Sequence, residues 1–338
     1  MGTDPKGSFT THANYLRAFA TLCGYHPLAA KRSDVLPKLA TRARRVLPGG
    51  PPGRGLPLDA IRRSLVNAWG TELILALSGQ YATEDELVRL VNNWGAVQAY
   101  YAVYHATQAL ALARGMPRPE SHPKTQRIFL DCWATRPLEP LGFTVGPEGL
   151  RCGLNAVPMG DVHAWTGCTP QTAWNIAGLA LRTTREDALH ETMRSKREQK
   201  RSAMRKAWRE EEATRVAAGK RPRHEPQFPL PHLTVAEKEQ VQRNTRAYGL
   251  IDYLYRLRIK TNYEDARMFL DGPVDSVSSG QVHRDLRRLV EGALLATELH
   301  VRERVGATSF GEWVRDWVDT KTPHDVQLGL AARTGAFR

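Results

Sequence analysis

Residues 99–115, AYYAVYHATQALALARG, place three tyrosines and a histidine on a segment with helical periodicity. On such a helix Tyr101 and His105 share one face, whereas Tyr100 and Tyr104 share the adjoining face. An imidazole can take a proton, and a face of this kind can hold a ligand. The same residues also fit a buried helix in which hydrogen bonds satisfy every polar group. The sequence leaves both interpretations open.

Histidine and arginine together can cleave RNA without a metal, because histidine takes the proton of the 2′-hydroxyl and arginine stabilises the charge on the phosphate. His105 pairs with Arg258, from the distant segment LIDYLYRLRIKTNY, if their two helices pack face to face. His105 is therefore one catalytic candidate.

Other chemistries find little support in the sequence. No GxSxG motif and no Walker-type glycine-rich loop occurs, which argues against serine-hydrolase and intrinsic NTPase activity. The four cysteines are widely spaced and form no CxxC pair, so a disulfide framework is not expected. Cys152, His163 and Cys168 are near one another, but their spacing matches no common zinc site. We therefore predict buried thiols, no metal and no cofactor.

The chain is strongly basic, with a formal net charge of +13 and a pI near 9.8, which favours a polyanionic partner such as RNA or DNA. Residues 182–224 hold 14 Lys/Arg and seven Asp/Glu, with high helix propensity and a thin apolar stripe. This pattern predicts an exposed charged helix, either simply solvated or in contact with nucleic acid. The candidate contacts are Arg194, Lys196, Arg197, Lys200, Arg201, Arg205 and Lys206.

Apolar residues recur at helical spacing through most of the chain, and strand signals are sparse, so the sequence predicts a mainly α protein. The best strand-like segment is GLRCGLNAVPM, residues 149–159. We expect Thr83 to cap a long helix that has a break near NNWG, and Ser278 or Ser279 to cap the last strong helix. The final residues are expected to fray.

These elements predict four regions. They are an N-terminal helical region, 1–80, with a Pro/Gly linker at 48–57; a core from 81–132 plus 245–306; an insertion, 133–244, with an irregular part (133–175) and a basic charged helix (182–220); and a C-terminal short helix and tail, 307–338.

Three segments in order resemble the HEPN domain family. The family's aromatic-aromatic-x-x-aromatic-His-Ala helix resembles residues 100–106, and its turn and Lys-Ser/Thr-His-like loop resemble the stretch from Gly115 to Gln126. The family's Arg-x-x-Ala-Asp-Tyr segment resembles residues 258–263, where Asn262 stands in place of the usual Asp. The resemblance implies an antiparallel helical bundle that often dimerises. It also implies an N-terminal helical extension and a large charged helical insertion in this chain.

Many members of that family are RNA-cleaving toxins of prokaryotic conflict systems, or partners of small nucleotidyltransferases. Catalytic members carry an Arg-x(4–6)-His motif, yet no histidine follows Arg258 within range. The motif matches at Arg185 and His190 in the insertion, which are the other catalytic candidates, although residues five apart on a continuous helix point away from one another. Asn262 and Tyr263 can bind a base or a phosphate but are poor proton acceptors. The resemblance therefore implies a ligand-binding or core polar face rather than a standard catalytic site. That face comprises Tyr101, Tyr104, His105, Arg258, Asn262 and Tyr263.

The resulting expectation is a HEPN-like protein of a prokaryotic defence or toxin system that binds RNA or DNA through its basic arm. Two alternatives stay open: a metal-independent ribonuclease, and an assembly subunit that binds only protein. A homo-oligomer and a nucleotidyltransferase or other defence-system partner are implied by the resemblance. No segment has the length and hydropathy of a membrane span, and the expected location is the cytoplasm.

Overall fold

The computed structural model describes residues 4–25, 31–47, 53–81, 84–146, 169–265, 267–321 and 328–337. These residues are mainly α-helical, as predicted, and their only β pairing is an isolated bridge between Val145 and Tyr248. The elements are α1 (Pro5–Leu22), α2 (Arg32–Val46), α3 (Leu58–Tyr81), α4 (Asp85–Ala113), α5 (His122–Trp133), α6 (Pro170–Ala217), α7 (Val235–Asn244), α8 (Leu250–Ile259), the π-helix η3 (Lys260–Glu264), α9 (Met268–Asp271), α10 (Ser276–Val305), α11 (Ala307–Lys321) and the 3₁₀ helix η4 (Gly329–Phe337).

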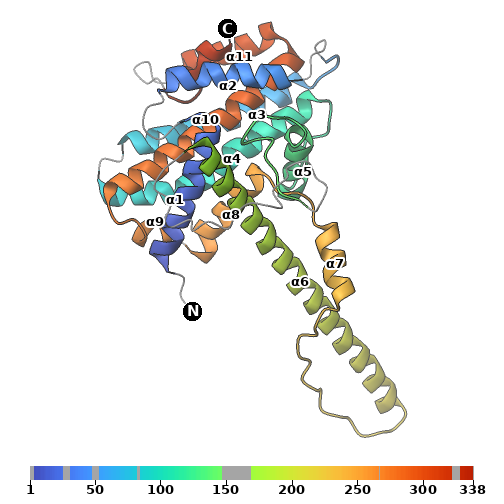
Figure 1. Ribbon diagram of the computed structural model, residues 1–338. Coiled ribbons are helices and arrows are strands. Elements are labelled where there is room, and N and C mark those ends of the chain that lie inside the picture. The colour runs from blue at the N-terminus through green and yellow to red at the C-terminus, as the bar shows by residue number, and fades with distance from the viewer. Residues whose placement is uncertain are drawn as a thin grey trace.

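Helices α3, α4 and α10 form the centre of a helical body (Figure 1). The apolar stripe of α3 is buried, with Ile61, Leu65 and Trp69 at most 1% exposed, because its residues recur at the 3.6-residue period. One side of α4 consists of alanines, which let a neighbouring helix approach closely. These alanines are Ala102, Ala106, Ala109 and Ala113, all buried.

The long α4 and the distant α8 pack against each other, and α5 packs against both. Helices α4 and α5 therefore share one core with α8 and α10, although more than a hundred residues separate the two pairs in the chain. Helices α1 and α2 contact α10, so the N-terminal region belongs to the same continuous core. This arrangement places the tyrosine-rich part of α4 opposite Arg258 of α8.

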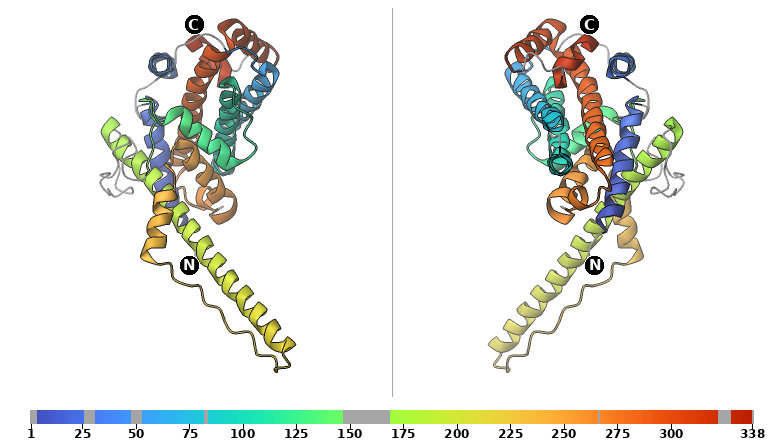
Figure 2. Two further views of the ribbon diagram at one scale, coloured as in Figure 1. Left: turned by 90° about the vertical axis from the view of Figure 1, so that its right-hand side faces the viewer. Right: turned by 90° about the vertical axis from the view of Figure 1, so that its left-hand side faces the viewer.

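Helix α6 projects from the body as an arm (Figures 1 and 2). Its first turns pack on α1 and α8, and its remaining length is largely exposed. The chain returns along it through residues 218–234 and α7. Lys200 holds this return by an ion pair of 2.6 Å to Glu237, and Arg197 by hydrogen bonds to the carbonyls of Pro231 and Leu230. We call α6, residues 218–234 and α7 the arm.

The arm helix begins earlier than the sequence predicts. The irregular part was expected to reach residue 175 and the charged helix to start at 182, but α6 starts at Pro170. Thr169 and Thr172 form a capping box, and proline is favoured in the first helical turn because its missing N–H needs no partner there. These local signals start the helix before its charged part.

Two further boundaries differ from the prediction. Helix α4 runs without a break through NNWG, because Asn92 is buried and its side chain donates a hydrogen bond to the Ser279 carbonyl. Helix α10 is capped by Asp275, whose carboxylate accepts from the Ser278 N–H at 2.7 Å, and not by a serine. Thr83 and residues 149–159 lie outside the described residues.

The C-terminal segment is packed and not frayed. Arg333 in η4 is 1% exposed and forms ion pairs of 2.5 Å with both Glu72 of α3 and Glu298 of α10. Trp69 also donates a hydrogen bond to Glu298 at 2.7 Å. A single arginine thus joins η4 to two helices of the central bundle through a buried network.

Candidate functional site

Arg258 lies among tyrosine rings where α8 faces α4. Its guanidinium carbon is 5.7 Å from the ring centre of Tyr100, 5.2 Å from that of Tyr101 and 5.6 Å from that of Tyr255. Such distances allow cation–π attraction. The two segments singled out in the sequence therefore meet. We call the group the Arg258 cluster: Tyr100, Tyr101, Tyr104, His105, His122, Tyr255 and Arg258.

The charge of Arg258 has no acidic partner among the described residues. No described carboxylate forms an ion pair with it, and its buried Nε has no hydrogen-bond partner. The neighbouring Arg256, by contrast, pairs with Asp187 at 3.2 Å and Glu264 at 2.6 Å. The aromatic rings thus hold a half-buried cation whose hydrogen-bonding capacity is not used up.

His122 belongs to this cluster, although it was not predicted as a site residue. It is the first residue of α5, and its Nδ1 lies 2.7 Å from the hydroxyl oxygen of Tyr100. Partial burial and the charge of Arg258 lower the pKa of His122, so its imidazole is neutral at pH 7. Burial raises the pKa of Tyr100, which keeps its phenolic proton.

His105 lies at the other end of the cluster. Its Nδ1 is 3.2 Å from the carbonyl oxygen of the Gln108 side chain, which only accepts, so Nδ1 carries the proton. Gln108 is itself held by the carbonyl of Pro119 and by Arg118. Burial lowers the pKa of His105. The His105 ring stacks on Tyr101, and Tyr101 also faces Arg258. Tyr101 therefore lies between the histidine and the arginine that the sequence paired.

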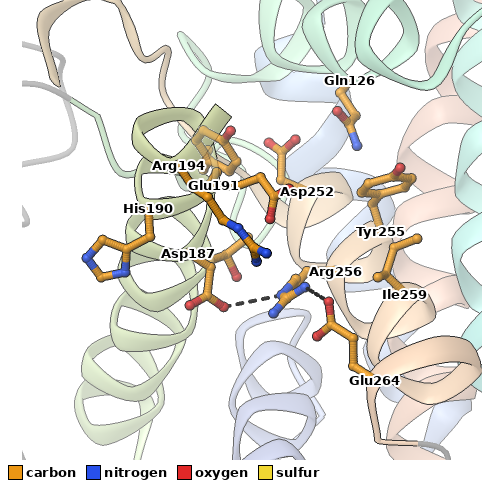
Figure 3. Close-up of a pocket in the computed structure, with 13 residues that line it drawn as sticks. Gln126, Asp187, His190, Glu191, Arg194, Asp252, Tyr255, Arg256, Ile259 and Glu264 are labelled. Atoms are coloured by element: carbon orange, nitrogen blue, oxygen red, sulfur yellow. Dashed lines mark hydrogen bonds and ion pairs between the residues drawn. The ribbon is translucent and has the colours of Figure 1, made fainter. Parts of the chain in front are cut away.

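Arg185 and His190 do not come together. Arg185 donates hydrogen bonds to the carbonyls of Gln242 at 3.1 Å and Thr245 at 3.4 Å, and thereby ties the end of α7 to α6. His190 is exposed, and Figure 3 shows its ring pointing away from Arg256. The helix explains this separation. Side chains five residues apart are rotated by about 140° beyond one full turn, so they point to nearly opposite sides of α6.

A pocket of about 590 Å³ lies between α6 and α8, next to the Arg258 cluster (Figure 3). Arg256 crosses it to reach Asp187 and Glu264, and Arg194 points into it from α6. Tyr255 lines the pocket and also contacts His122, with 5.4 Å between ring centres. The pocket and the cluster are therefore continuous through one tyrosine.

Internal contacts take up much of the predicted basic surface of the arm. Ion pairs join Lys200 to Glu237, Arg201 to Glu198, Arg205 to Glu225 and Lys206 to Glu210. Arg197 is bound to backbone carbonyls. Arg194 and Lys196, at the base of the arm, form no ion pair with a described carboxylate and line pockets on its two sides.

The remaining predicted residues lie near the cluster but have separate surroundings. Asn262 and Tyr263 belong to η3, the π-helix that directly follows α8, and Tyr263 is 72% exposed. Gln126 accepts a hydrogen bond from Arg246, and Arg246 forms an ion pair of 2.6 Å with Asp252. Gln126 therefore takes part in a hydrogen-bond network that joins α5 to α8.

Two cluster residues were missed in the sequence, although each carried a signal. Tyr255 precedes Arg258 by three residues and therefore shares its helix face. His122 precedes Pro123 in SHPKT, and proline favours the first turn of a helix.

The described residues contain no group of three or more His, Cys, Asp or Glu side chains suited to a metal ion. Cys152, His163 and Cys168 lie outside the described residues. Within the described ranges, every helix is too short or too polar to span a bilayer. The chain matches no protein-family model, no curated protein and no solved structure.

Proposed function

We propose that this protein binds single-stranded nucleic acid at the Arg258 cluster, as a HEPN-like protein of a prokaryotic defence or toxin system. Proteins that bind single strands combine cations for the phosphates with aromatic rings on which unpaired bases stack. The cluster offers both, since Tyr101 and Tyr255 are only partly buried beside Arg258. RNA and DNA share this chemistry, and the test below includes both.

The observation that carries the proposal is the state of Arg258. A half-buried guanidinium without a carboxylate partner is costly unless something else interacts with its charge. Tyrosine rings supply part of that interaction, and a phosphate supplies the rest in bidentate geometry. The adjoining pocket of about 590 Å³ has room for a base or sugar next to that phosphate.

The base of the arm extends this surface. Arg194 points into the pocket beside the cluster, and Lys196 lies on the other side of α6. Since ion pairs within the arm engage many of the cations further along it, we assign nucleic-acid contact to its base and not to its tip. The overall charge of +13 adds long-range attraction for any polyanion.

HEPN-likeness is part of this proposal. Its support is that residues 81–132 and 245–306, which carry the resembling motifs, contribute to one helical core. The proposed defence or toxin role rests on the same resemblance.

Arg258→Ala is expected to weaken binding of a fluorescent single-stranded RNA or DNA about tenfold or more, because a charge-assisted phosphate contact and its stacking support are lost. Anisotropy titrations at about 50 and 200 mM salt measure this, and wild type should show the steeper salt dependence. Arg267→Ala is the matched control, since Arg267 is exposed and pairs with Asp271. Equal affinities for wild type and both variants would contradict the proposal.

A metal-independent ribonuclease is the second candidate, favoured by His122. A neutral imidazole beside an arginine can accept the 2′-hydroxyl proton while the arginine stabilises the phosphate. The tautomer with its proton on Nδ1 donates to the Tyr100 oxygen and leaves Nε2 as the proton acceptor.

If the chain cleaves RNA in EDTA, His122→Gln is expected to lower the rate about a hundredfold or more, the usual size of a general-base effect. Arg258→Ala should lower it too. His190→Gln should cleave like wild type, because His190 lies at the exposed rim of the pocket and its ring points away from Arg256. Cleavage that persists in His122→Gln but disappears in His105→Gln rejects His122 as the base.

A further inference from the structure

A small pocket of about 180 Å³ lies where the end of α1 and the start of α2 meet α10. It is far more basic than the α6–α8 pocket, since arginines are four of the six described residues that line it. The lining residues are Tyr25, Arg32, Arg284, Arg287, Arg288 and Glu291.

Helical spacing gathers three of these arginines. Arg284, Arg287 and Arg288 stand at positions i, i+3 and i+4 of α10 and therefore share one face of the helix. Arg32 is the first residue of α2, so the positive end of that helix dipole adds to the field. Arg288 also lies over the ring of Tyr25, at 5.1 Å from its centre, which fixes the guanidinium in place.

The acidic groups nearby offset only part of this charge. Glu291 is 4% exposed, pairs with Arg32 at 2.6 Å and lies 4.0 Å from Arg287. It also accepts a hydrogen bond from Tyr25 at 3.1 Å. Among the described residues that line the pocket, one carboxylate thus faces several guanidinium groups.

Arg284 and Arg288 of α10 add further positive charge that carboxylates offset only in part. Arg288 is 3.4 Å from Asp285, a carboxylate that Arg17 also approaches at 3.9 Å. Arg284 hydrogen-bonds to the neutral Gln281 and forms no ion pair with a described carboxylate. No described group accepts a hydrogen bond from the buried Nε of Arg287, and burial lowers the pKa of this arginine although the charges of Glu291 and Glu72 raise it. The pocket therefore holds excess positive charge in a partly desolvated site.

We propose that this pocket binds the phosphate group of a small phosphorylated molecule. Guanidinium groups match phosphate oxygens in bidentate geometry, and a multiply charged anion offsets the repulsion among the arginines. The volume is below the roughly 300–1,000 Å³ typical of pockets that enclose a whole drug-sized ligand, so it suits a phosphate or diphosphate end. Different elements form this pocket and the Arg258 cluster, so the inference goes beyond the proposed function.

Titration calorimetry of the full chain in chloride buffer at constant ionic strength tests this. The probes are inorganic phosphate, pyrophosphate and glycerol phosphate, which separate free phosphate, diphosphate and phosphate ester as sources. We expect saturable binding of at least one of them with one site per chain. Arg284→Gln should weaken it about fivefold or more, and Arg284→Gln with Arg287→Gln about fiftyfold or more, because charge-assisted hydrogen bonds are lost.

Arg302→Gln is the matched control. Arg302 lies on the same helix, about 22 Å beyond Arg287 and about 27 Å beyond Arg284 by the rise of 1.5 Å per residue, and its exposure resembles that of Arg287. Binding by this variant should equal that of wild type. Arg284 is exposed, so Arg284→Gln is expected to keep the wild-type circular dichroism and melting temperature. No saturable binding of any probe, or equal weakening by Arg302→Gln, overturns the proposal.

Discussion

Replacing Arg333 with alanine is expected to lower the free energy of unfolding by about 3–5 kcal/mol, the cost of leaving buried charges without their partner. Arg333 pairs at 2.5 Å with Glu72 and with Glu298, and all three side chains are at most 3% exposed. Without the guanidinium, the carboxyl groups of Glu72 and Glu298 stay buried with no cation beside them, and burial already favours the protonated form of Glu72. Urea denaturation followed by circular dichroism measures the change.

Arg62→Ala provides the comparison, because Arg62 also pairs with a carboxylate, Asp316 at 2.7 Å, but at the surface. It should cost at most about 1 kcal/mol, since exposed ion pairs contribute little. Arg333→Lys should be intermediate, because an ammonium group cannot reproduce the forked contact with two carboxylates. A loss below about 1 kcal/mol for Arg333→Ala would show that η4 does not hold to the core in this way.

Lowering the pH from 7 to about 5 is expected to destabilise the protein through three buried histidines. Burial is the main reason that the pKa falls to about 3 in His12, about 4 in His283 and about 3 in His300. As the pH falls through about 6.5, these three histidines take up protons in the unfolded chain but stay neutral in the folded chain. The stability contribution is therefore present above pH 6.5 and is lost as the pH falls, by about 2 kcal/mol per histidine at pH 5.

His300→Phe isolates this effect. His300 lies against Trp133 with 5.9 Å between ring centres, and neither of its ring nitrogens has a hydrogen-bond partner. Arg114, Arg136 and Arg304 further lower its pKa. Phenylalanine preserves the ring contact and cannot take up a proton, so the variant should lose about 2 kcal/mol less than wild type between pH 7 and 5.

The comparison between variant and wild type is needed because Glu72 acts in the opposite direction. Burial raises the pKa of Glu72 to about 7, so its folded form keeps a proton that the unfolded form releases above pH 4.5. That contribution is lost as the pH rises, and it is the same in both proteins. Identical pH profiles for wild type and His300→Phe would refute the assignment.

The sequence by itself determined the helical class and much of the buried surface. The stripes of α3 and α10 follow from a period of 3.6 residues, which is a local property and specifies which face of a helix avoids water. The charge of the arm follows from composition alone. The meeting of the tyrosine helix with Arg258 was expected only through the resemblance to a family, because periodicity does not state which buried faces pair.

Tertiary structure alone decided which charges are available. Lys200 looks like a phosphate contact in the sequence, but it forms an ion pair with Glu237 of α7. Arg333 looks like part of a frayed end, but it is buried between Glu72 and Glu298. In the part of the chain that the structure describes, Arg258 has no carboxylate partner and gains His122 as a neighbour. The physical reason is that the field at a charge depends on groups within a few ångströms, and folding brings those groups from distant parts of the chain.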